Sequence, residues 1–92
     1  MSEIDRANKA LAILDNPVYA ESFQMVRAAI IDRIERCPLA ETQTAEDLRR
    51  CLRLLNDVKL NLEVAVKQGK VASFRLEQDK QRKENPLRNL FR

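Results

Sequence analysis

Three arginines, Arg49, Arg50 and Arg53, form the densest basic cluster in the central part of the chain. Arg49 and Arg53 share a helix face because they are four residues apart, and Arg50 lies beside them. Guanidinium groups gathered in this way contact phosphate oxygens, so these three residues are candidate phosphate contacts. Acidic neighbours within one helical turn, including Asp47 and Asp57, offer the alternative in which ion pairs neutralise the cluster.

A second candidate site lies at the C-terminal end and consists of Leu87, Arg88, Leu90, Phe91 and Arg92. The three apolar residues have the spacing i, i+3, i+4, which places them together on one turn of helix. A short amphipathic peptide of this kind docks in a groove on a partner protein. The alternative is a frayed terminus without a function. A wholly polar stretch separates this segment from the rest of the chain, which favours docking as a peptide.

Residues for catalysis and metal binding are scarce. The chain has no histidine, which removes the commonest general base and the commonest metal ligand. Its two cysteines, Cys37 and Cys51, are too few for a four-ligand zinc site. A turn between two antiparallel helices would place Cys51 opposite residues 30–31, so no disulfide is expected. We expect two buried or half-buried thiols, no cofactor, no metal and no enzymatic activity.

Capping residues and helix-breaking residues in the sequence predict three helices. Ser2 is the expected cap of the first, and Asp15 or Asn16, directly before a proline, caps the second. Thr44 is the expected N-cap of the third, and Gly69 is expected to end it in the C′ position. We interpret Gly69 as a helix end and not as part of a nucleotide-binding loop, because the rest of that loop pattern is missing from the sequence. The predicted helices span about residues 3–14, 17–36 and 45–68.

Both long helices carry a regular apolar stripe, and further apolar residues lie outside it. In the second helix the stripe consists of Tyr19, Phe23, Val26, Ile30, Ile34 and Cys37. In the third it has heptad spacing and consists of Leu48, Cys51, Leu55, Val58, Leu62 and Ala65. A short loop between long helices favours antiparallel packing. The surplus apolar surface is covered either by folding into a compact monomeric bundle or by other subunits, and we favour the second.

The predicted fold is therefore all-α: an antiparallel helical hairpin with a short N-terminal helix and a C-terminal polar tail, forming an oligomer. Residues 1–76 make the helical domain, and residues 77–92 make a polar and basic tail with a terminal apolar docking segment. The 92 residues suffice for one small domain. The whole net charge of +3 falls in residues 75–92, because residues 1–74 hold 11 basic and 11 acidic side chains. A basic end can attract nucleic acid or another acidic surface, but we favour the interpretation as a solvated charged end.

Several features between Leu14 and Ala72 resemble a known group of proteins. They are Leu14-Asp15-Asn16-Pro17 opening a helix, Tyr19 and Phe23 on that helix, a capped polar turn, and a Leu-rich helix closed by Gln68-Gly69-Lys70. This stretch, about two thirds of the chain, resembles small helical-hairpin proteins encoded among the head and DNA-packaging genes of tailed bacteriophages and prophages. The resemblance implies a role in virion assembly or packaging, in the cytoplasm of a bacterial host or within the virion. It implies no active site.

The leading hypothesis is a non-enzymatic protein-interaction or assembly module, such as a phage head or packaging accessory protein, whose partner is another protein or further copies of itself. The alternative is a small nucleic-acid-binding protein acting in packaging or regulation through the arginine cluster and the tail. An inhibitor of a host enzyme is a third hypothesis. No run of about 20 apolar residues or leader-like segment is present, so no membrane association is expected.

Overall fold

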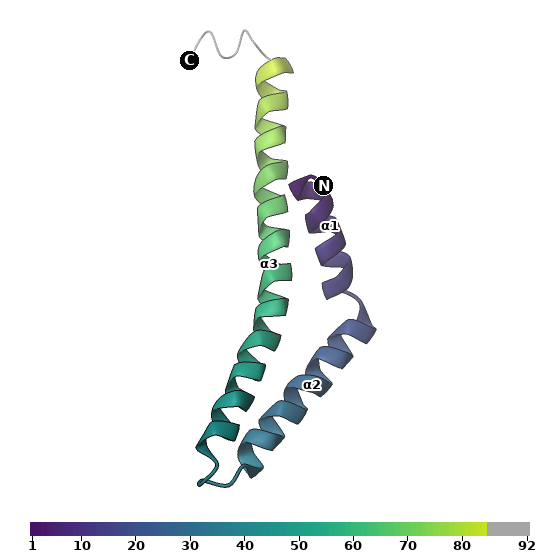
Figure 1. Ribbon diagram of the computed structural model, residues 1–92. Coiled ribbons are helices and arrows are strands. Elements are labelled where there is room, and N and C mark those ends of the chain that lie inside the picture. The colour runs from purple at the N-terminus through teal and green to yellow at the C-terminus, as the bar shows by residue number, and fades with distance from the viewer. Residues whose placement is uncertain (85–92) are drawn as a thin grey trace.

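The computed structural model describes residues 1–84 and contains three helices, α1 (Glu3–Leu14), α2 (Pro17–Arg36) and α3 (Thr42–Glu84). The described part of the chain contains no strand, which confirms the all-α prediction. α1 and α2 follow one another along one side of α3 and run in the opposite direction to it (Figure 1). The 43 residues of α3 span about 65 Å at 1.5 Å per residue. The molecule is a rod, with principal extents of 73 × 27 × 20 Å.

The bounds of α1 and α2 agree with the sequence prediction because side-chain caps fix them locally. The backbone N–H of Asp5 donates to Ser2 Oγ at 3.1 Å and satisfies one free donor at the start of α1. The backbone N–H groups of Val18 and Tyr19 donate to Asn16 Oδ1 at 2.8 and 3.3 Å. Asn16 is therefore the cap of α2, and the short break before it turns the chain from α1 into α2.

α3 begins three residues before its predicted start. The backbone N–H of Glu41 donates to the carbonyl of Pro38 at 3.0 Å, which closes the turn after α2. The N–H of Ala45 then donates to the carbonyl of Glu41 at 3.2 Å, so helical bonding is established before Thr44. Thr44 lies inside the helix, and its prediction as the N-cap is wrong. The tight turn supplies the start of α3 through backbone bonds in place of a capping side chain.

Gly69 does not end α3, which continues to Glu84, so the predicted third helix of residues 45–68 is too short. Gly69 is buried and has an ordinary helical φ. A Cβ atom built on it would overlap Ala7 Cβ and lie 3.2 Å from the carbonyl oxygen of Glu3. Glycine in a helix interior costs about 1 kcal/mol relative to alanine. Here the missing Cβ allows α1 to approach α3 closely, and this contact offsets the cost.

The polar stretch 77–84 continues α3, and the side chains of residues 77–83 are exposed. No helix end marks residue 76, where the sequence predicted the helical domain to finish. α3 extends well past the N-terminal end of α1 and stands alone there (Figure 1). Every described side chain from residue 74 to residue 83 is exposed. The packed part of the molecule therefore lies along the first two thirds of α3.

The core is small and lies mainly between α1 and α3. Its buried hydrophobic residues are Ala7, Ala10 and Phe23, which are 4–8% exposed. Ala7 and Ala10 face α3 from α1, where small side chains permit the close approach at Gly69. α2 packs against α3 less extensively and contributes Phe23. A core of this size leaves most of the apolar surface of the long helices uncovered.

The inner row of α3 differs in part from the predicted stripe. Leu48, Leu55, Leu62 and Ala65 are half-buried as expected, but Cys51 and Val58 are exposed. In the inner row of α3, Leu52 stands in place of Cys51 and Lys59 in place of Val58. The buried or half-buried row with heptad spacing consists of Leu48, Leu52, Leu55, Lys59, Leu62, Val66 and Gly69. The prediction placed Val58 inside because it is apolar, whereas the long stem of its neighbour Lys59 fills this position.

Candidate interaction surface

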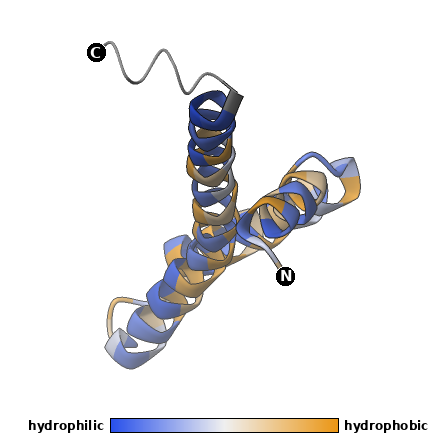
Figure 2. Cartoon of the chain, turned by 90° about the horizontal axis from the view of Figure 1, so that it is seen from above, coloured by the Kyte–Doolittle hydropathy of each residue, from blue (hydrophilic) through white to orange (hydrophobic). Residues whose placement is uncertain are grey.

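Large hydrophobic side chains are exposed over much of the molecule. Among residues 1–84 fourteen of them are exposed, compared with three buried hydrophobic residues. Figure 2 shows hydrophobic positions around the circumference of the helices and not only between them. Single exposed apolar residues are common on proteins, but contiguous groups of them mark interaction sites. The surface of interest is therefore the place where exposed apolar residues of different helices adjoin.

Such residues adjoin in an open groove of about 600 Å³ between α1 and α3, which we call the α1/α3 groove. No acidic residue lines it. Its α1 side contains the apolar residues Ala10 and Ile13 together with two basic residues, Arg6 and Lys9. The groove is completed by Met1, Val58, Asn61, Leu62, Val64, Ala65 and Gln68. An apolar floor with a basic rim suits an amphipathic helix that carries acidic residues at its edge.

A row on α3, the lateral stripe, continues from this groove toward the turn after α2, and its residues are exposed except for the half-buried Ala65. Each of its residues directly precedes a residue of the inner row, and successive members are 4, 3, 4, 3 and 4 residues apart in the sequence. The lateral stripe consists of Asp47, Cys51, Leu54, Val58, Asn61 and Ala65. Leu54 is 64% exposed and Val58 is 54% exposed. A 3–4 spacing of this kind holds a row on one helix face, so α3 presents a second seam that neither α1 nor α2 covers at Leu54 and Val58.

The other flank of α3 is polar. A hollow there of about 370 Å³ between α2 and α3 is lined by Phe23 and by polar residues that include Arg27, Asp57 and Glu63. Lys59 Nζ lies 5.2 Å from the centroid of the Phe23 ring, within the range of a cation–π contact. The two flanks of α3 thus differ in character, since one is apolar with a basic rim and the other carries charges of both signs.

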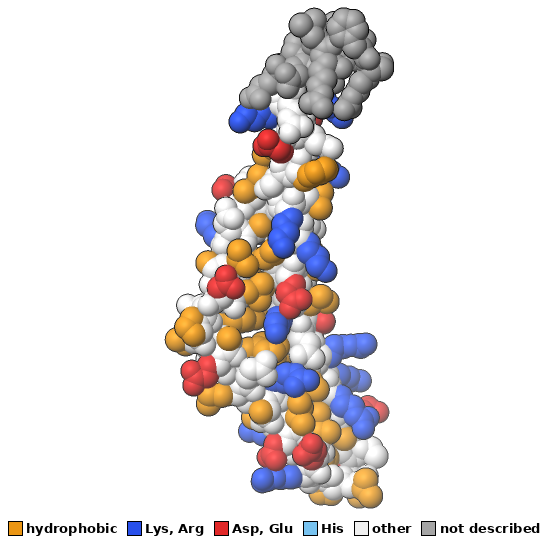
Figure 3. All heavy atoms as spheres, turned by 180° about the vertical axis from the view of Figure 1, so that it is seen from behind, with side chains coloured by type: hydrophobic (Ala, Val, Ile, Leu, Met, Phe, Trp, Pro, Cys, Tyr) orange, Lys and Arg blue, Asp and Glu red, His pale blue; other side chains and the backbone are white. Residues whose placement is uncertain are grey.

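The arginine cluster lies on the outer surface of the N-terminal half of α3, where Figure 3 shows basic side chains grouped. Arg49, Arg50 and Arg53 are all exposed. Arg50 lies 3.7 Å from a carboxylate oxygen of Asp47, and neither Arg49 nor Arg53 forms a salt bridge with any residue of the described chain. The predicted neutralisation by acidic neighbours is therefore confined to Arg50. Two guanidinium groups four residues apart face solvent.

The two thiols differ from each other. Both cysteines are free, as expected. Cys37 is half-buried at the end of α2, with its Sγ 3.6 Å from the carbonyl oxygen of Glu41. Cys51 is exposed, which contradicts the expectation of a buried or half-buried thiol. It is exposed because it belongs to the lateral stripe and not to the inner row.

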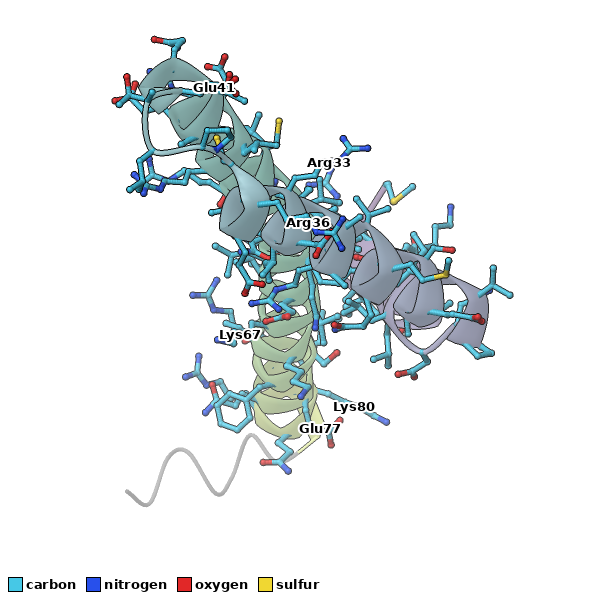
Figure 4. All side chains as sticks on the ribbon, turned by 90° about the horizontal axis from the view of Figure 1, so that it is seen from below. Arg33, Arg36, Glu41, Lys67, Glu77 and Lys80 are labelled. Atoms are coloured by element: carbon cyan, nitrogen blue, oxygen red, sulfur yellow. The ribbon has the colours of Figure 1, made fainter. Side chains whose placement is uncertain are left out.

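Charged residues elsewhere are dispersed. Figure 4 labels Arg33 and Arg36 on α2, Glu41 in the turn, and Lys67 and Lys80 farther along α3, and their side chains do not converge on a common point. Among residues 1–84 no group of three or more potential ligands is placed to hold a metal ion. Within the same range no helix has the length and apolar character needed to cross a membrane. The predicted docking residues Leu87, Arg88, Leu90, Phe91 and Arg92 lie outside the described residues.

Sequence reasoning missed the α1/α3 groove and the basic residues at its rim. Lys9 and Ile13 belong to a helix whose apolar pattern was used only to locate it. The available signal was the combination of Ala7 and Ala10 with a single glycine in a long helix, since small residues mark close helix approach. Comparisons of the chain with protein-family models, with curated proteins and with solved structures found no match. The interpretation of this surface therefore rests on its own geometry and chemistry.

Proposed function

We propose that this chain is a non-enzymatic protein-interaction module, an antiparallel helical hairpin with α1 folded along α3, that acts as a subunit of a larger assembly. The resemblance of residues 14–72 to phage head and packaging proteins favours virion assembly as its setting, in a bacterial host or in the virion. Oligomerisation or binding to another helical protein would cover the apolar rows that the chain leaves open. No step of chemistry is needed for this role.

The observation that carries this proposal is the imbalance between buried and exposed apolar surface. Leu54, Val58 and Phe74 are each more than half exposed, and within the described part of the chain only Ala7, Ala10 and Phe23 form the buried core. Isolated helices depend on tertiary packing for most of their stability. A 43-residue helix that packs over only part of its length gains from any partner that covers the remaining seam. The structure is therefore suited to packing its exposed apolar residues against a partner, in place of reacting with a substrate.

The test is thermal unfolding of the purified chain over a hundredfold range of concentration, followed by circular dichroism. If association covers the apolar rows, a hundredfold increase in concentration should raise the Tm by on the order of 5–10 °C, because association stabilises only the folded form. The mass in solution, measured by light scattering, gives the stoichiometry. A chain that remains a monomer of 10.7 kDa and melts at the same temperature throughout would contradict self-association.

The alternative function, nucleic-acid binding, is favoured by one observation: Arg49 and Arg53 are exposed and free of salt bridges in the described chain. Three phosphate contacts by the arginine cluster would give a salt slope of about −2.7, or an affinity loss of roughly 40-fold between 50 and 200 mM salt. Anisotropy of a labelled duplex measures this directly. The double variant Arg49→Gln/Arg53→Gln should lower the slope by about 2, with Arg33→Gln/Arg36→Gln on α2 as the control. No binding at low salt would eliminate this function.

A further inference from the structure

The exposed area of the chain exceeds that of a compact monomer. Monomers of 10.7 kDa expose about 5,500 Å², whereas this chain exposes 7787 Å². If residues 85–92 accounted for the roughly 1,500 Å² of a fully extended segment, the remaining area of about 6,300 Å² would still exceed the about 5,100 Å² of a compact monomer of 84 residues by about 1,200 Å². The excess is thus roughly 1,200–2,300 Å² per chain, or about 2,400–4,600 Å² for a pair. Permanent homodimers bury about 2,000–5,000 Å² in total, so the excess is of the size that a second copy covers.

The C-terminal residues of the same chain cannot reach the centre of this surface. Val58 lies 26 residues before Glu84 on one continuous helix, a distance of about 39 Å. Eight residues extend at most about 29 Å. Residues 85–92 therefore cannot cover Val58 of their own chain. The centre of the lateral stripe is therefore open to another molecule.

The lateral stripe is self-complementary when two copies run antiparallel. Its six positions are symmetric about the midpoint between Leu54 and Val58. An antiparallel copy therefore places Leu54 against Val58 of the other copy, and Val58 against its Leu54. The same register pairs Cys51 with Asn61, and Asp47 with Ala65. Each contact occurs twice, as a two-fold interface requires.

Charge supports the same register. Ala65 and Lys9 line the same groove, so Asp47 of one copy would enter the groove of the other beside Lys9. Among the described residues of its own chain, none that lines that groove is acidic. Within one chain Asp47 lies 18 residues from Ala65 on α3, which is about 27 Å. An Asp47–Lys9 contact can therefore form only between copies.

We propose that a second copy of this chain packs antiparallel on the lateral stripe and the α1/α3 groove, with Leu54 and Val58 at the two-fold axis and Asp47 of each copy beside Lys9 of the other. This inference rests on the proposed function, because it names the surface through which the module associates. It also assigns a role to the two most exposed apolar residues of the stripe. The exposed Cys51 thiol becomes covered in the pair.

The first test compares Val58→Asp with Leu60→Asp by light scattering and sedimentation. Val58 and Leu60 are both 54% exposed on α3, but Leu60 lines the polar hollow of the opposite flank. The unchanged chain should have a mass of about 21 kDa, twice that of one copy. Val58→Asp should weaken dimerisation by on the order of 100-fold or more, because two apolar contacts are lost and two carboxylates meet near the axis. Leu60→Asp should leave the mass at that of the pair.

A charge reversal provides a second test that does not depend on a core substitution. Lys9→Asp should weaken dimerisation by about tenfold, since two pairs of like charges then face each other across the interface. Adding Asp47→Lys to the same chain should restore the affinity. Because these two residues are far apart within one copy, restoration reports a contact between copies. Failure of Asp47→Lys to restore the affinity would overturn the proposed register.

The outcomes separate this inference from the proposed function. If the chain associates but Val58→Asp and Leu60→Asp behave alike, the proposed interface is wrong and the interaction module stands. If the chain remains a monomer at every concentration and its Tm is constant, the second copy is excluded and self-association fails with it. A monomer whose groove binds a peptide helix with acidic edges, with loss on Val58→Asp, would overturn the two-fold pairing and assign the groove to a different protein.

Discussion

Replacing Gly69 by alanine should destabilise the chain, although the same change stabilises an ordinary helix. Alanine is favoured over glycine in a helix interior by about 1 kcal/mol. The added Cβ, however, would overlap Ala7 Cβ and lie 3.2 Å from the carbonyl oxygen of Glu3. Both neighbours are fixed to the α1 backbone, so no flexible side chain can move aside. α1 must shift away from α3 as a unit.

The magnitude follows from these two opposing effects. Overpacking in a tight contact costs about 1–3 kcal/mol, and the upper end applies here because the clash involves backbone-fixed atoms. Subtracting the gain in helix propensity leaves a net loss of about 2 kcal/mol. For a chain of this size that lowers the Tm by roughly 8–16 °C. The assay is thermal unfolding followed by circular dichroism, at one fixed protein concentration so that association contributes equally to both proteins.

The control is the exchange variant Ala7→Gly/Gly69→Ala, which moves one Cβ from α1 to α3. The glycine and alanine propensities then cancel, and the remaining contacts of the new Cβ are 3.2 Å to Glu3 O and 3.5 Å to Ala7 Cα. Its stability should return to within about 1 kcal/mol of the unchanged chain. A higher Tm for Gly69→Ala alone would refute this reasoning, because it would mean that Gly69 is an unpacked position whose flexibility alone matters.

Further substitutions test other parts of the fold by thermal or denaturant unfolding. Asn16→Ala should cost about 1 kcal/mol, because two backbone donors lose their acceptor; an equal loss for the exposed Asn8→Ala would argue against the cap. Tyr19→Phe should leave stability unchanged or raise it by up to about 1 kcal/mol, since the buried Tyr19 hydroxyl has no partner in the described chain, and a clear loss would reveal a missed hydrogen bond. A double-mutant cycle of Lys59→Met and Phe23→Leu should give a coupling of about 0.5–1 kcal/mol, and additive effects would exclude the cation–π contact.

Local signals in the sequence were sufficient for α1 and α2. Their starts depend on Ser2 and Asn16, whose side chains bond to backbone groups two or three residues away. The extent of α3 depends on a contact between Gly69 and Ala7, which are far apart in the chain. A glycine at the end of an apolar pattern and a glycine under a crossing helix look alike in sequence. The end of the third helix was therefore predicted wrongly because the role of Gly69 depends on a tertiary contact.

The candidate site was less accessible than the fold. The arginine cluster was identified from spacing, but the restriction of ion pairing to Arg50 required side-chain positions. The stripe on α3 was assigned one position off at Cys51 and Val58, because counting apolar residues cannot place Lys59 inside. The α1/α3 groove depends on how α1 is rotated about α3. Neither helix alone specifies that rotation, so its lining could not be derived from periodicity.

The solitary end of α3 has a consequence for the free energy of recognition. Forming the first turn of a helix is the unfavourable step, with a nucleation constant of about 10⁻³, whereas each further residue adds to an existing turn at little cost. In α3 the first turns form against α1 and α2, so residues 74–83 extend a nucleus that already exists. A ligand that meets Phe74 and Leu76 there encounters side chains already in helical register, with exposures of 65% and 59%. Its binding therefore does not carry the free-energy cost of starting a helix.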